Sequence, residues 1–544
     1  MLNTLIGALA AAKNSFSQKD ALNFGAGTTK IRFTQAAWEK LCTHHRHQSG
    51  KERCSAAFGR VITHAHGRTV LVTERDLVIY QPTDYTRQSM AFVQLSDAAV
   101  RRLMWTFAQS GCDALITMHD HFFAHADTQF SGTDDAQDLK RDHYLREVFE
   151  PMLQKNPGFG APRSVLHIAL VFDQSGYDAR IVDCRLPEPL RPIDGVQVVG
   201  KRFASLAPNS AKQPAKHAGG KGTAHMARLA RHKDFIPDEV CATLRGLTVG
   251  VVGCGGLGPM VAENLARLGV GRLLLIDSDR LEESNLNRWL AGEQSQVGRY
   301  KVELLAERLS RSLEGLSVVA VPENVLDATG QAALRGCDLI FAAVDCDGAR
   351  FAVNRIAVQQ LVPYFDLGVL VQVQPCLDFQ TRIVPVLPGT SACLECSALG
   401  LLNQKQIARG LDGNLDQARE SAGYAPQIQA SAPSVMGLNM WLAGLVTLDL
   451  IAYLTGASQL AGGAEQNVPL LKTMRWRTGR ITAVTPAGHA PSADCACCVA
   501  LLGVGDAAEV PKRRSAEDLR AVIAGIALLL PSAVDTAAPQ ICAE

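Results

Sequence analysis

Short apolar runs alternate with longer apolar stretches in the second half of this chain. Residues 249–252, 273–276 and 339–344 are rich in Val, Ile and Leu, which is typical of buried strands. The stretch 436–454 is long enough to cross a membrane, but its internal Asn and Asp favour a buried core helix. This pattern predicts an α/β, Rossmann-like domain with a predominantly parallel sheet.

A polar segment separates this half from an N-terminal unit. Residues 206–224 are rich in Lys, Pro, Gly, Ala and Ser, and they have no apolar period, so we expect a linker. The predicted organisation is an N-terminal α+β domain over 1–205, the linker, a second domain over 225–500 and a helical tail over 501–544.

A glycine-rich loop follows the first strand of the second domain. Only Gly lets the backbone approach a phosphate closely at a helix N-terminus. Asp277 follows the loop by 19 residues, at the end of the next apolar run, where an acidic group meets ribose hydroxyls in a doubly wound fold. Alone, the loop would suit a dehydrogenase, a methyltransferase or a flavoprotein equally. Its GxGGxG glycines are Gly253, Gly255, Gly256 and Gly258.

The charged residues that follow narrow this prediction. Arg288 lies 11 residues after Asp277, and Lys301 lies 13 residues after Arg288. Two cations suit nucleotidyl transfer, in which negative charge builds up on the α-phosphate and the leaving pyrophosphate. Asp345 ends the run LIFAAVD and could hold Mg²⁺. Asp279, two residues after Asp277, is a further candidate for the nucleotide site.

Four cysteines form two CxxC pairs about a hundred residues apart. Such pairs are the ligands of a tetrahedral structural Zn²⁺, which would then clamp distant segments together. Cys497 lies inside the second pair, and we expect it to be a bystander. The proposed ligands are Cys393, Cys396, Cys495 and Cys498.

Composition excludes several classes of protein. The chain has 54 basic and 53 acidic residues, so no electrostatic case exists for binding nucleic acid or an anionic membrane. Fifteen Cys in 544 residues, with no signal peptide, do not form a disulfide scaffold, and we expect a cytoplasmic protein.

A second chemical cluster lies in the N-terminal unit. His119 and His121 alternate on an extended segment, so both imidazoles can face one metal. Asp134, from the pattern Ser131-x-x-Asp134, would be a third ligand and would leave a fourth position open, as in catalytic Zn²⁺ sites. Glu52 could act as general base, and Ser131 could hydrogen-bond a developing oxyanion. The alternative is that the two histidines are ordinary polar loop residues.

From about Arg231 to Cys498, these motifs resemble the ubiquitin-activating, ThiF/MoeB-type adenylyltransferase family. The resemblance implies a homodimer that uses ATP to adenylate the C-terminal carboxylate of a small β-grasp protein. It also implies that Arg231 enters the partner subunit's site. By the same resemblance the ribose ligand is Asp277, the triphosphate ligands are Asn285, Arg288 and Lys301, the Mg²⁺ ligand is Asp345, and the CxxC pairs bind Zn²⁺.

The N-terminal cluster resembles the JAMM/JAB-type metallopeptidases, which have a cytidine-deaminase-like fold and cut ubiquitin-like proteins. The chain departs from that pattern in having Phe122 in place of Pro after the second His, and nine residues between His121 and Ser131. His125 and Asp127 in this gap are rival ligands, and Glu74 is a rival for Glu52.

The chain has no cysteine at the position where related enzymes often form a thioester. In relatives the nucleophile often lies on the crossover loop, here residues 420–439, and this stretch contains no Cys. Cys254, Cys346 and Cys376 are candidates that more often serve as small buried residues, and Cys542 is a free cysteine. A conjugating enzyme could supply the thiol instead.

Three functional hypotheses follow. The first is a fused processing peptidase and activating enzyme of a bacterial ubiquitin-like conjugation system, a type linked to antiviral defence. The second is a sulfur-carrier adenylyltransferase with the same fusion. The third is an active adenylation domain joined to a non-catalytic JAMM-like docking module.

Overall fold

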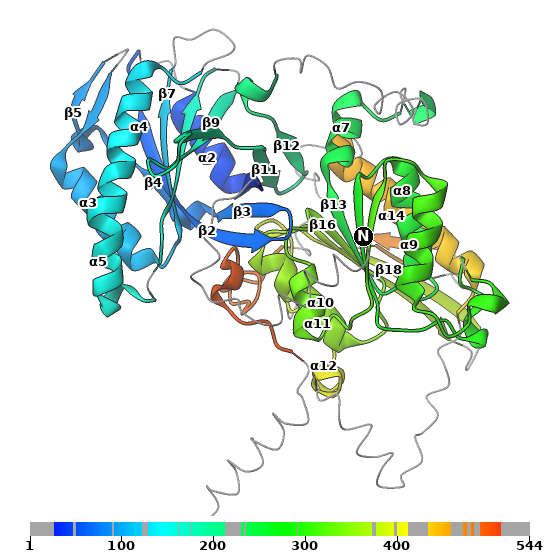
Figure 1. The fold of residues 1–544 in the computed structure, drawn as a ribbon. Coiled ribbons are helices and arrows are strands. Elements are labelled where there is room, and N and C mark those ends of the chain that lie inside the picture. Colours follow the sequence, from blue (N-terminus) through cyan, green and yellow to red (C-terminus); the bar gives the residue numbers. More distant parts are fainter. Residues whose placement is uncertain are drawn as a thin grey trace, which may run out of the picture.

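Two large β-sheets, one in each half of the chain, organise the fold (Figure 1). The computed structural model describes residues 27–512, except for 47–49, 90–91, 122–128, 162, 175, 213–229, 233–234, 291, 373–376, 397–399, 412–433, 458–471, 476–479 and 484–489. The predicted ligand rivals His125 and Asp127 and most of the crossover loop therefore lie outside the described residues, as do Phe122, Cys376, Cys542 and the predicted tail helix.

The N-terminal sheet has ten strands in the order β10-β9-β8-β7-β2-β3-β1-β11-β12, with β4 paired to β2. It is mixed, because β1 is parallel to β3 and β11, and β7 is parallel to β8, whereas the other pairs are antiparallel. The strands are β1 (Thr28–Thr34), β2 (Cys54–His64), β3 (Gly67–Val72), β4 (Leu77–Ile79), β7 (Ala114–Asp120), β8 (Leu166–Phe172), β9 (Tyr177–Val182), β10 (Leu190–Pro192), β11 (Gly195–Val199) and β12 (Ala204–Leu206).

Helices cover both faces of this sheet. Helix α2 packs on one face, in a core that includes Trp38, Ile116 and Phe172. On the other face, α3 and the continuous α4–α5 segment pack around Phe107 and Phe149. A small hairpin, β5 (Tyr85–Gln88) and β6 (Val93–Leu95), lies beside α3. The helices are α2 (Gln35–His45), α3 (Asp97–Ser110), α4 (Gly132–Tyr144), a π-helical turn (Leu145–Phe149) and α5 (Glu150–Lys155).

The second sheet has the order β15-β14-β13-β16-β17-β18-β19-β20. Its strands are parallel from β15 to β17 and antiparallel from β17 to β20, which confirms the predicted predominantly parallel α/β arrangement in its first part. The strands are β13 (Thr248–Val252), β14 (Arg272–Ile276), β15 (Ser317–Val321), β16 (Leu339–Ala342), β17 (Tyr364–Gln372), β18 (Asp378–Val386), β19 (Lys472–Arg475) and β20 (Arg480–Ala483).

Two hydrophobic cores flank this sheet. Helices α7, α8, α9 and α14 share one core, and α10 and α11 share the other with the four CxxC cysteines. In the sheet, β13 lies between β14 and β16, so the strands that follow β13 are added first towards one edge of the sheet and then, from β16 on, towards the other. In open α/β sheets, ligands bind at the point where the strand order switches in this way. The helices are α7 (Asp238–Gly246), α8 (Gly258–Leu268), α9 (Lys301–Ser312), α10 (Ala328–Ala333), α11 (Asp347–Gln359), α12 (Gln404–Leu411) and α14 (Met436–Thr455).

Helix α14 is, within the described part of the chain, the one helix long and apolar enough to cross a membrane. It lies in the core beside α8, with Asn439 2% and Asp449 8% exposed, and Asp449 pairs with Lys472. These contacts agree with the prediction of a core helix.

The N-terminal unit extends beyond the predicted boundary at residue 205. Strand β12 continues to Leu206, and a turn over Asn209–Lys212 follows it. Asn209 Nδ2 donates to Asp173 Oδ2 at 3.0 Å, and Ser210 Oγ donates to Asp178 Oδ1 at 2.7 Å. Polar composition suggested a linker from residue 206, but these side chains are bonded to the sheet instead.

Buried contacts join the two domains. Arg32 in β1 is 2% exposed, and its Nη2 lies 3.1 Å from Asp338 Oδ1, at the start of β16. Its guanidinium also donates to the carbonyl oxygens of Cys337 and Gln360. The N-terminal domain therefore packs against the amino ends of the parallel strands, opposite the edge that carries the glycine loop (Figure 1).

Candidate functional site

The glycine loop lies at the carboxyl end of β13. Gly253 has φ of +87°, a conformation that favours Gly. A Cβ placed on Gly258 would lie 1.9 Å from the Gly253 carbonyl oxygen, and one on Gly256 would lie 2.6 Å from Asn439 Nδ2. A Cβ on Gly255 would meet nothing within 4 Å, so that position faces the open space into which a phosphate group would fit.

Asp277 lies beside this loop, directly after β14. Its Oδ2 accepts a hydrogen bond from Cys254 N at 2.5 Å, and its Oδ1 accepts one from Asp279 N at 2.7 Å. Burial, together with the charge of Asp279, raises the pKa of the Asp277 carboxyl. The predicted ribose ligand therefore lies at the glycine loop, as the resemblance requires.

The predicted cations lie on the same edge. Lys301 begins α9, is 6% exposed, and holds its Nζ 2.8 Å from Asp279 Oδ2. Arg288 lies over the glycine loop, since a Cβ on Gly256 would come within 3.5 Å of Arg288 Cδ. Ser284 O and Asn287 Oδ1 accept hydrogen bonds from Arg288 Nη1 at 2.8 and 3.0 Å.

Asn285 is buried in the short turn Glu283–Asn285, where its Oδ1 accepts a hydrogen bond from Glu282 N. This contact gives Asn285 a structural role in addition to the predicted role at the phosphates. The neighbouring Trp289 donates from Nε1 to Cys254 O at 2.8 Å, and thereby ties this turn to the glycine loop.

Asp345 is exposed on the loop after β16, and this loop contacts the glycine loop, because a Cβ on Gly253 would lie 2.7 Å from Ala343 O. The sequence analysis did not identify Arg350, the residue that holds the loop after β16 in place. Arg350 in α11 donates to Val344 O and Leu367 O and pairs with the buried Asp366. A charged residue among the apolar positions of α11 was the available signal.

Arg231 lies on the surface, in a short turn (Ala230–His232) ahead of α7. Its predicted insertion into a second subunit stays a prediction.

The four predicted zinc ligands come together although a hundred residues separate the pairs. Cys393 Sγ lies 3.7 Å from Cys495 Sγ, and Cys396 Sγ lies 3.5 Å from Cys498 Sγ. Zn–S bonds of about 2.3 Å in a tetrahedron place sulfurs about 3.8 Å apart, so this all-thiol set fits Zn²⁺. All four ligand side chains are buried. Cys497 is also buried, and its Sγ accepts a hydrogen bond from Asn354 Nδ2 at 3.4 Å.

The N-terminal cluster also converges. His119 Nε2 lies 3.2 Å from His121 Nε2 and 3.1 Å from Asp134 Oδ1, and His121 Nε2 lies 3.5 Å from Asp134 Oδ2. A tetrahedral Zn²⁺ with bonds of about 2.0–2.1 Å has ligand atoms about 3.3–3.4 Å apart, so these three donors fit it. Burial opposes ionisation of Asp134, but hydrogen bonds from His119 and Ser131 hold the pKa of this carboxyl below its ordinary value.

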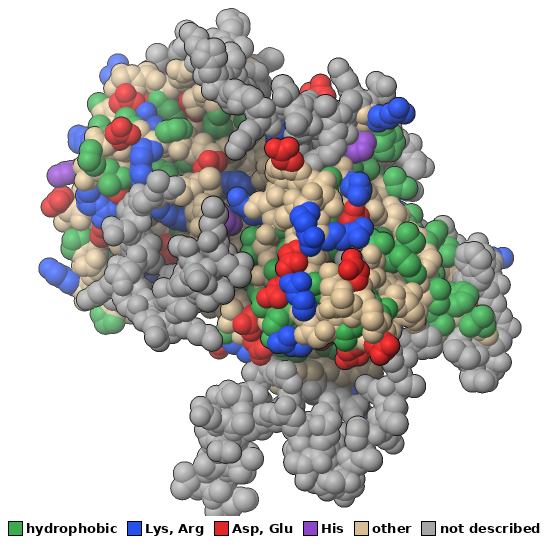
Figure 2. Space-filling model, turned by 45° about the vertical axis from the view of Figure 1, so that its right-hand side comes forward, with side chains coloured by type: hydrophobic (Ala, Val, Ile, Leu, Met, Phe, Trp, Pro, Cys, Tyr) green, Lys and Arg blue, Asp and Glu red, His purple; other side chains and the backbone are tan. Residues whose placement is uncertain are grey.

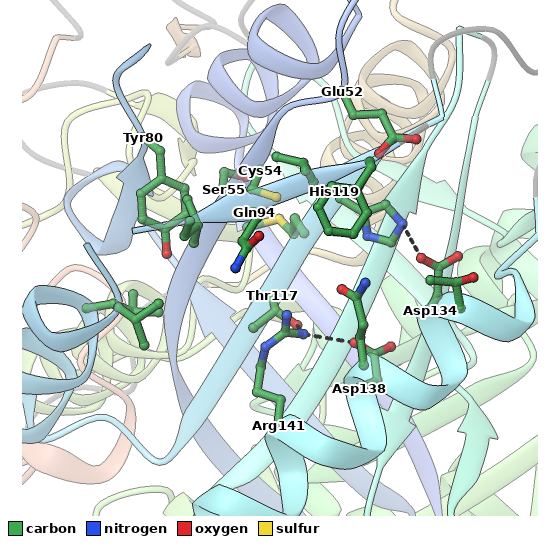
Figure 3. A pocket seen from close by; sticks show the side chains of 18 of the residues that line it. Glu52, Cys54, Ser55, Tyr80, Gln94, Thr117, His119, Asp134, Asp138 and Arg141 are labelled. Atoms are coloured by element: carbon green, nitrogen blue, oxygen red, sulfur yellow. Dashed lines mark hydrogen bonds and ion pairs between the residues drawn. The ribbon is translucent and has the colours of Figure 1, made fainter. Parts of the chain in front are cut away.

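Glu52 lies beside these ligands (Figure 3). Cys54 pairs with His119 at the end of the β2–β7 ladder, and Glu52, two residues before Cys54, lines the same cavity as His119 and His121. Glu52 is 6% exposed, and burial raises the pKa of its carboxyl to about 7. Its rival Glu74 is exposed and pairs with Lys40.

The Ser131-x-x-Asp134 pattern forms a helix capping box. Ser131 is the N-cap of α4, where its Oγ and N both donate to Asp134 Oδ2, and Asp134 N donates to Ser131 Oγ. The Ser131-x-x-Asp134 motif therefore has two roles, because it starts helix α4 and also orients the side chain of Asp134. Ser131 is exposed and reaches the cavity that holds the ligands, so its predicted role with an oxyanion stays a prediction.

A cavity of about 570 Å³ contains this cluster. Figure 3 shows Glu52, His119 and Asp134 at one end, and Thr117, Gln94 and Arg141 further along. Its other wall is apolar, with contributions from α3 such as Val100 and Met104.

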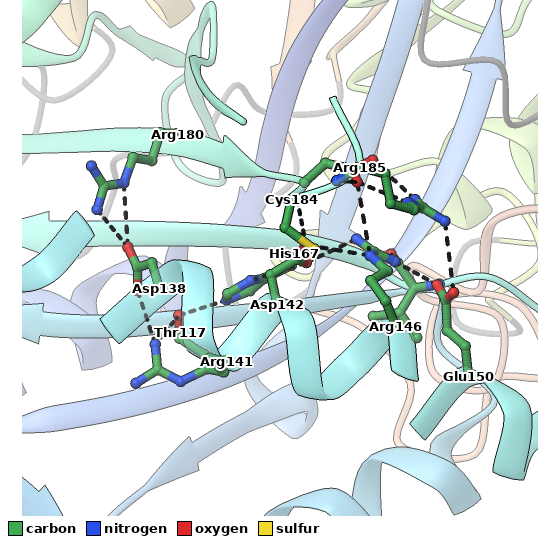
Figure 4. Close-up of polar contacts among 12 residues, drawn as sticks. Thr117, Asp138, Arg141, Asp142, Arg146, Glu150, His167, Arg180, Cys184 and Arg185 are labelled. Atoms are coloured by element: carbon green, nitrogen blue, oxygen red, sulfur yellow. Dashed lines mark hydrogen bonds and ion pairs between the residues drawn. The ribbon is translucent and has the colours of Figure 1, made fainter. Parts of the chain in front are cut away.

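Ion pairs of the buried carboxylates Asp138 and Asp142 hold α4 on the sheet, and Asp138 and Arg141 also line the cavity (Figure 4). Asp138 pairs with Arg141 at 2.9 Å and with Arg180 at 2.7 Å. One turn further along, Asp142 pairs with Arg146 at 2.9 Å and lies 3.5 Å from His167 Nδ1. These contacts anchor the helix that carries Asp134.

The cysteine candidates for a thioester are poorly placed. Cys254 is fully buried, and burial raises the pKa of its thiol well above the ordinary value. Cys346 caps α11 with its sulfur, and burial raises the pKa of this thiol as well. Both thiols therefore have little thiolate character.

Taken together, the strand order and the glycine loop define a Rossmann-like α/β fold, and the four clustered cysteines could hold a metal ion. Residues 227–497 match the ThiF family, so this part of the chain is similar to the proteins of that family.

Similar proteins agree with this assignment. Ubiquitin-like modifier-activating enzyme 5 of Bombyx mori is 30% identical over 222 residues, which cover 39% of this chain and 51% of that protein. The enzyme of the same name from Branchiostoma floridae is 29% identical over 223 residues, covering 39% and 50%. The chain therefore spans about half the length of the curated relatives it matches.

Two solved structures align with about half of the chain. E. coli MccB with ATP is 21% identical, with a TM-score of 0.36, over 48% of this chain and 68% of that chain. PaaA is 19% identical, with a TM-score of 0.38, over 51% and 87%.

Proposed function

We propose that the ThiF-family domain activates the C-terminal carboxylate of a ubiquitin-like β-grasp protein. A carboxylate oxygen would attack the α-phosphorus of ATP, the bond to the bridging oxygen would break, and pyrophosphate would leave with that oxygen. The observation that carries this proposal is the convergence of Asp277, Lys301 and Arg288 on the glycine loop.

Each of these residues has a defined part in this proposal. Asp277 holds the ribose hydroxyls, while Lys301 and Arg288 bind the phosphates whose charge grows as the bond breaks. Asp345 would hold Mg²⁺, which would neutralise charge on the phosphates when bound. ATP–pyrophosphate exchange that depends on a β-grasp protein ending in Gly tests the proposal, and absence of exchange with every such carrier would refute it.

We further propose that the N-terminal domain is a JAMM-type zinc hydrolase that cuts such proteins at their C-terminal extension or from targets. Support comes from the three converging donors and from Glu52 in the same cavity. Zn²⁺ bound there would polarise the scissile carbonyl and supply an activated water. Glu52 would take up a proton and pass it to the leaving amine.

Cleavage of a C-terminally extended carrier tests this activity. We expect cleavage to require zinc and to disappear in Glu52→Gln, while pyrophosphate exchange is retained. A chain that exchanges pyrophosphate but cleaves no extended carrier would favour the docking-module alternative. In that case the cavity would bind the carrier without cutting it.

The group that receives the carrier from the adenylate distinguishes an activating enzyme of a ubiquitin-like conjugation system from a sulfur-carrier adenylyltransferase. Burial of Cys254 and the raised thiol pKa values of Cys254 and Cys346 favour direct transfer to a thiol on another protein, such as a conjugating enzyme, or to a sulfur donor. A carrier–enzyme adduct on a non-reducing gel that disappears with thiol reductant would show a thioester on this chain instead.

We also propose that the chain is a homodimer. Met440 and Leu448 of α14, and Leu370 and Leu377 of the β17–β18 hairpin, are each more than half exposed. Figure 2 shows hydrophobic side chains gathered towards the right of this view of the molecule. Apolar surface of this kind suits a second copy of the chain, and light scattering measures the resulting mass.

A further inference from the structure

Asp120 lies between the two histidine ligands but faces the opposite side of β7. Side chains alternate along a strand, so Asp120 points into the core beneath α2, and it is fully buried. Its Oδ2 lies 3.0 Å from Nδ1 of His45, the last residue of α2. His45 Nε2 in turn lies 2.7 Å from Ser55 Oγ, and the imidazole stacks on Phe172.

A linked Asp, His and Ser can activate a nucleophile, but the burial of this set excludes that use. Ser55 is 2% exposed and His45 is 1% exposed. Ser55 Oγ is directed to His45, on the α2 face of the sheet, whereas the metal ligands lie on the other face. An acyl group cannot be placed on this hydroxyl without opening the core.

The network instead joins the two segments of the hydrolytic site. The β2–β7 ladder ends at the pair Cys54 and His119. Beyond it, Asp120 N donates to Arg53 O at 3.2 Å, and Arg53 N donates to the Asp120 carboxylate at 3.2 Å. Glu52 directly precedes Arg53 in the chain, and His121 directly follows Asp120. The Asp120 carboxylate thus extends the pairing at the place where the strand ends.

We infer that Asp120, supported by His45, is a positioning residue that holds Glu52 in register with His119 and His121. This inference rests on the proposed hydrolase function. Residues that orient ligands from behind typically contribute about 10–100-fold to metal affinity or activity. The same carboxylate fixes the strand that carries both histidines and the segment that carries Glu52, so its loss should affect both properties.

The test compares the full-length variants Asp120→Ala and Asp183→Ala. Asp183 is also a buried carboxylate of this domain, 1% exposed and paired with Arg185 at 2.8 Å, but its contacts reach neither Glu52 nor the metal ligands. Zinc affinity is measured by competition with a chromophoric chelator, and the zinc held by the four cysteines serves as an internal reference. Cleavage of an extended carrier gives kcat and KM.

We expect Asp120→Ala to weaken binding of the second zinc about 10–100-fold and to lower kcat with little change in KM. Asp183→Ala should lower Tm without either effect. Asp120→Asn keeps an oxygen to accept from Arg53 N, so it should recover part of both losses, and it serves as the variant to study if Asp120→Ala does not fold.

Equal zinc affinity and kcat in both Asp120 variants and in wild type would overturn the positioning role alone. A wild-type chain that binds one zinc and cleaves no carrier would overturn the hydrolase proposal together with this inference. The two failures are therefore distinguishable.

Discussion

At the scale of single residues, charge at the glycine loop is arranged for a polyanion. Lys301 is buried with Asp279 as its partner, whereas Arg288 is held over the loop by one backbone carbonyl and one amide oxygen. Neither acceptor of Arg288 is charged, so its full positive charge is available to phosphate.

We expect Arg288→Ala to slow pyrophosphate exchange about 10²–10³-fold, because it removes a donor at the developing charge. Its hydrogen bonds lie on the surface, so Tm should not change. Arg299→Ala is the matched control, since Arg299 belongs to an exposed pair with Glu307. Equal exchange rates in Arg288→Ala and wild type would remove Arg288 from the phosphate site.

At the scale of elements, the four cysteines tie the segment after β18 to residues near the end of the described chain. A zinc ion there would join elements that are a hundred residues apart in the chain. Its ligands pack in the same core as α10 and α11.

Cys393→Ser should therefore lower the free energy of unfolding by about 3–5 kcal/mol and release the structural zinc. Cys497→Ser tests the bystander, and it should retain zinc because the four-thiol set is intact. Calorimetry and metal analysis check both. Unchanged zinc content in Cys393→Ser would show that these four cysteines do not hold a structural zinc ion.

At the scale of the whole molecule, a buried ion pair fixes the two domains together. Asp338 also accepts hydrogen bonds from Thr248 N and Gln197 Nε2, so three segments meet at one carboxylate. Burial opposes its ionisation, but Lys30 and Arg32 hold the pKa of Asp338 below its ordinary value of 3.8.

Arg32→Met should destabilise the protein by about 3–5 kcal/mol at neutral pH, since it leaves Asp338 buried and unpaired. A depressed folded pKa contributes stability that is complete above the unfolded pKa and is lost as pH falls through the folded value. The difference in Tm between wild type and Arg32→Met should therefore narrow below about pH 4. A difference that stays constant from pH 7 to pH 3 would contradict this account.

The proposed dimer has a test of its own. If Arg231 completes the partner's site, Arg231→Ala and Lys301→Ala chains should each fail in pyrophosphate exchange. Mixed dimers would then regain one working site, in which the Arg231→Ala chain keeps its own Lys301 and receives Arg231 from its partner. No recovery on mixing, with subunit exchange confirmed by mass, would place Arg231 in its own chain's site or outside both.

Local patterns predicted much of this molecule. The strands around residues 249–252 and 339–342 and the core helix α14 follow from the apolar runs of the sequence. The glycine loop, Asp277 and the CxxC pairs follow from spacing. The misplaced boundary at residue 205 had a local cause, because composition does not reveal that Asn209 and Ser210 bond to the sheet.

Residue types and their spacing by themselves determined which groups were available for chemistry, because turns, strand alternation and ligand pairs act over a few residues. Only the tertiary structure decided which distant groups meet. Strand pairing brought Glu52 to the cavity of the two histidines, and packing brought Cys393 to Cys495. It also buried Arg32 against Asp338, and it placed Asp120 behind the histidine ligands. These contacts depend on the order of strands in the sheets, which no local pattern encodes.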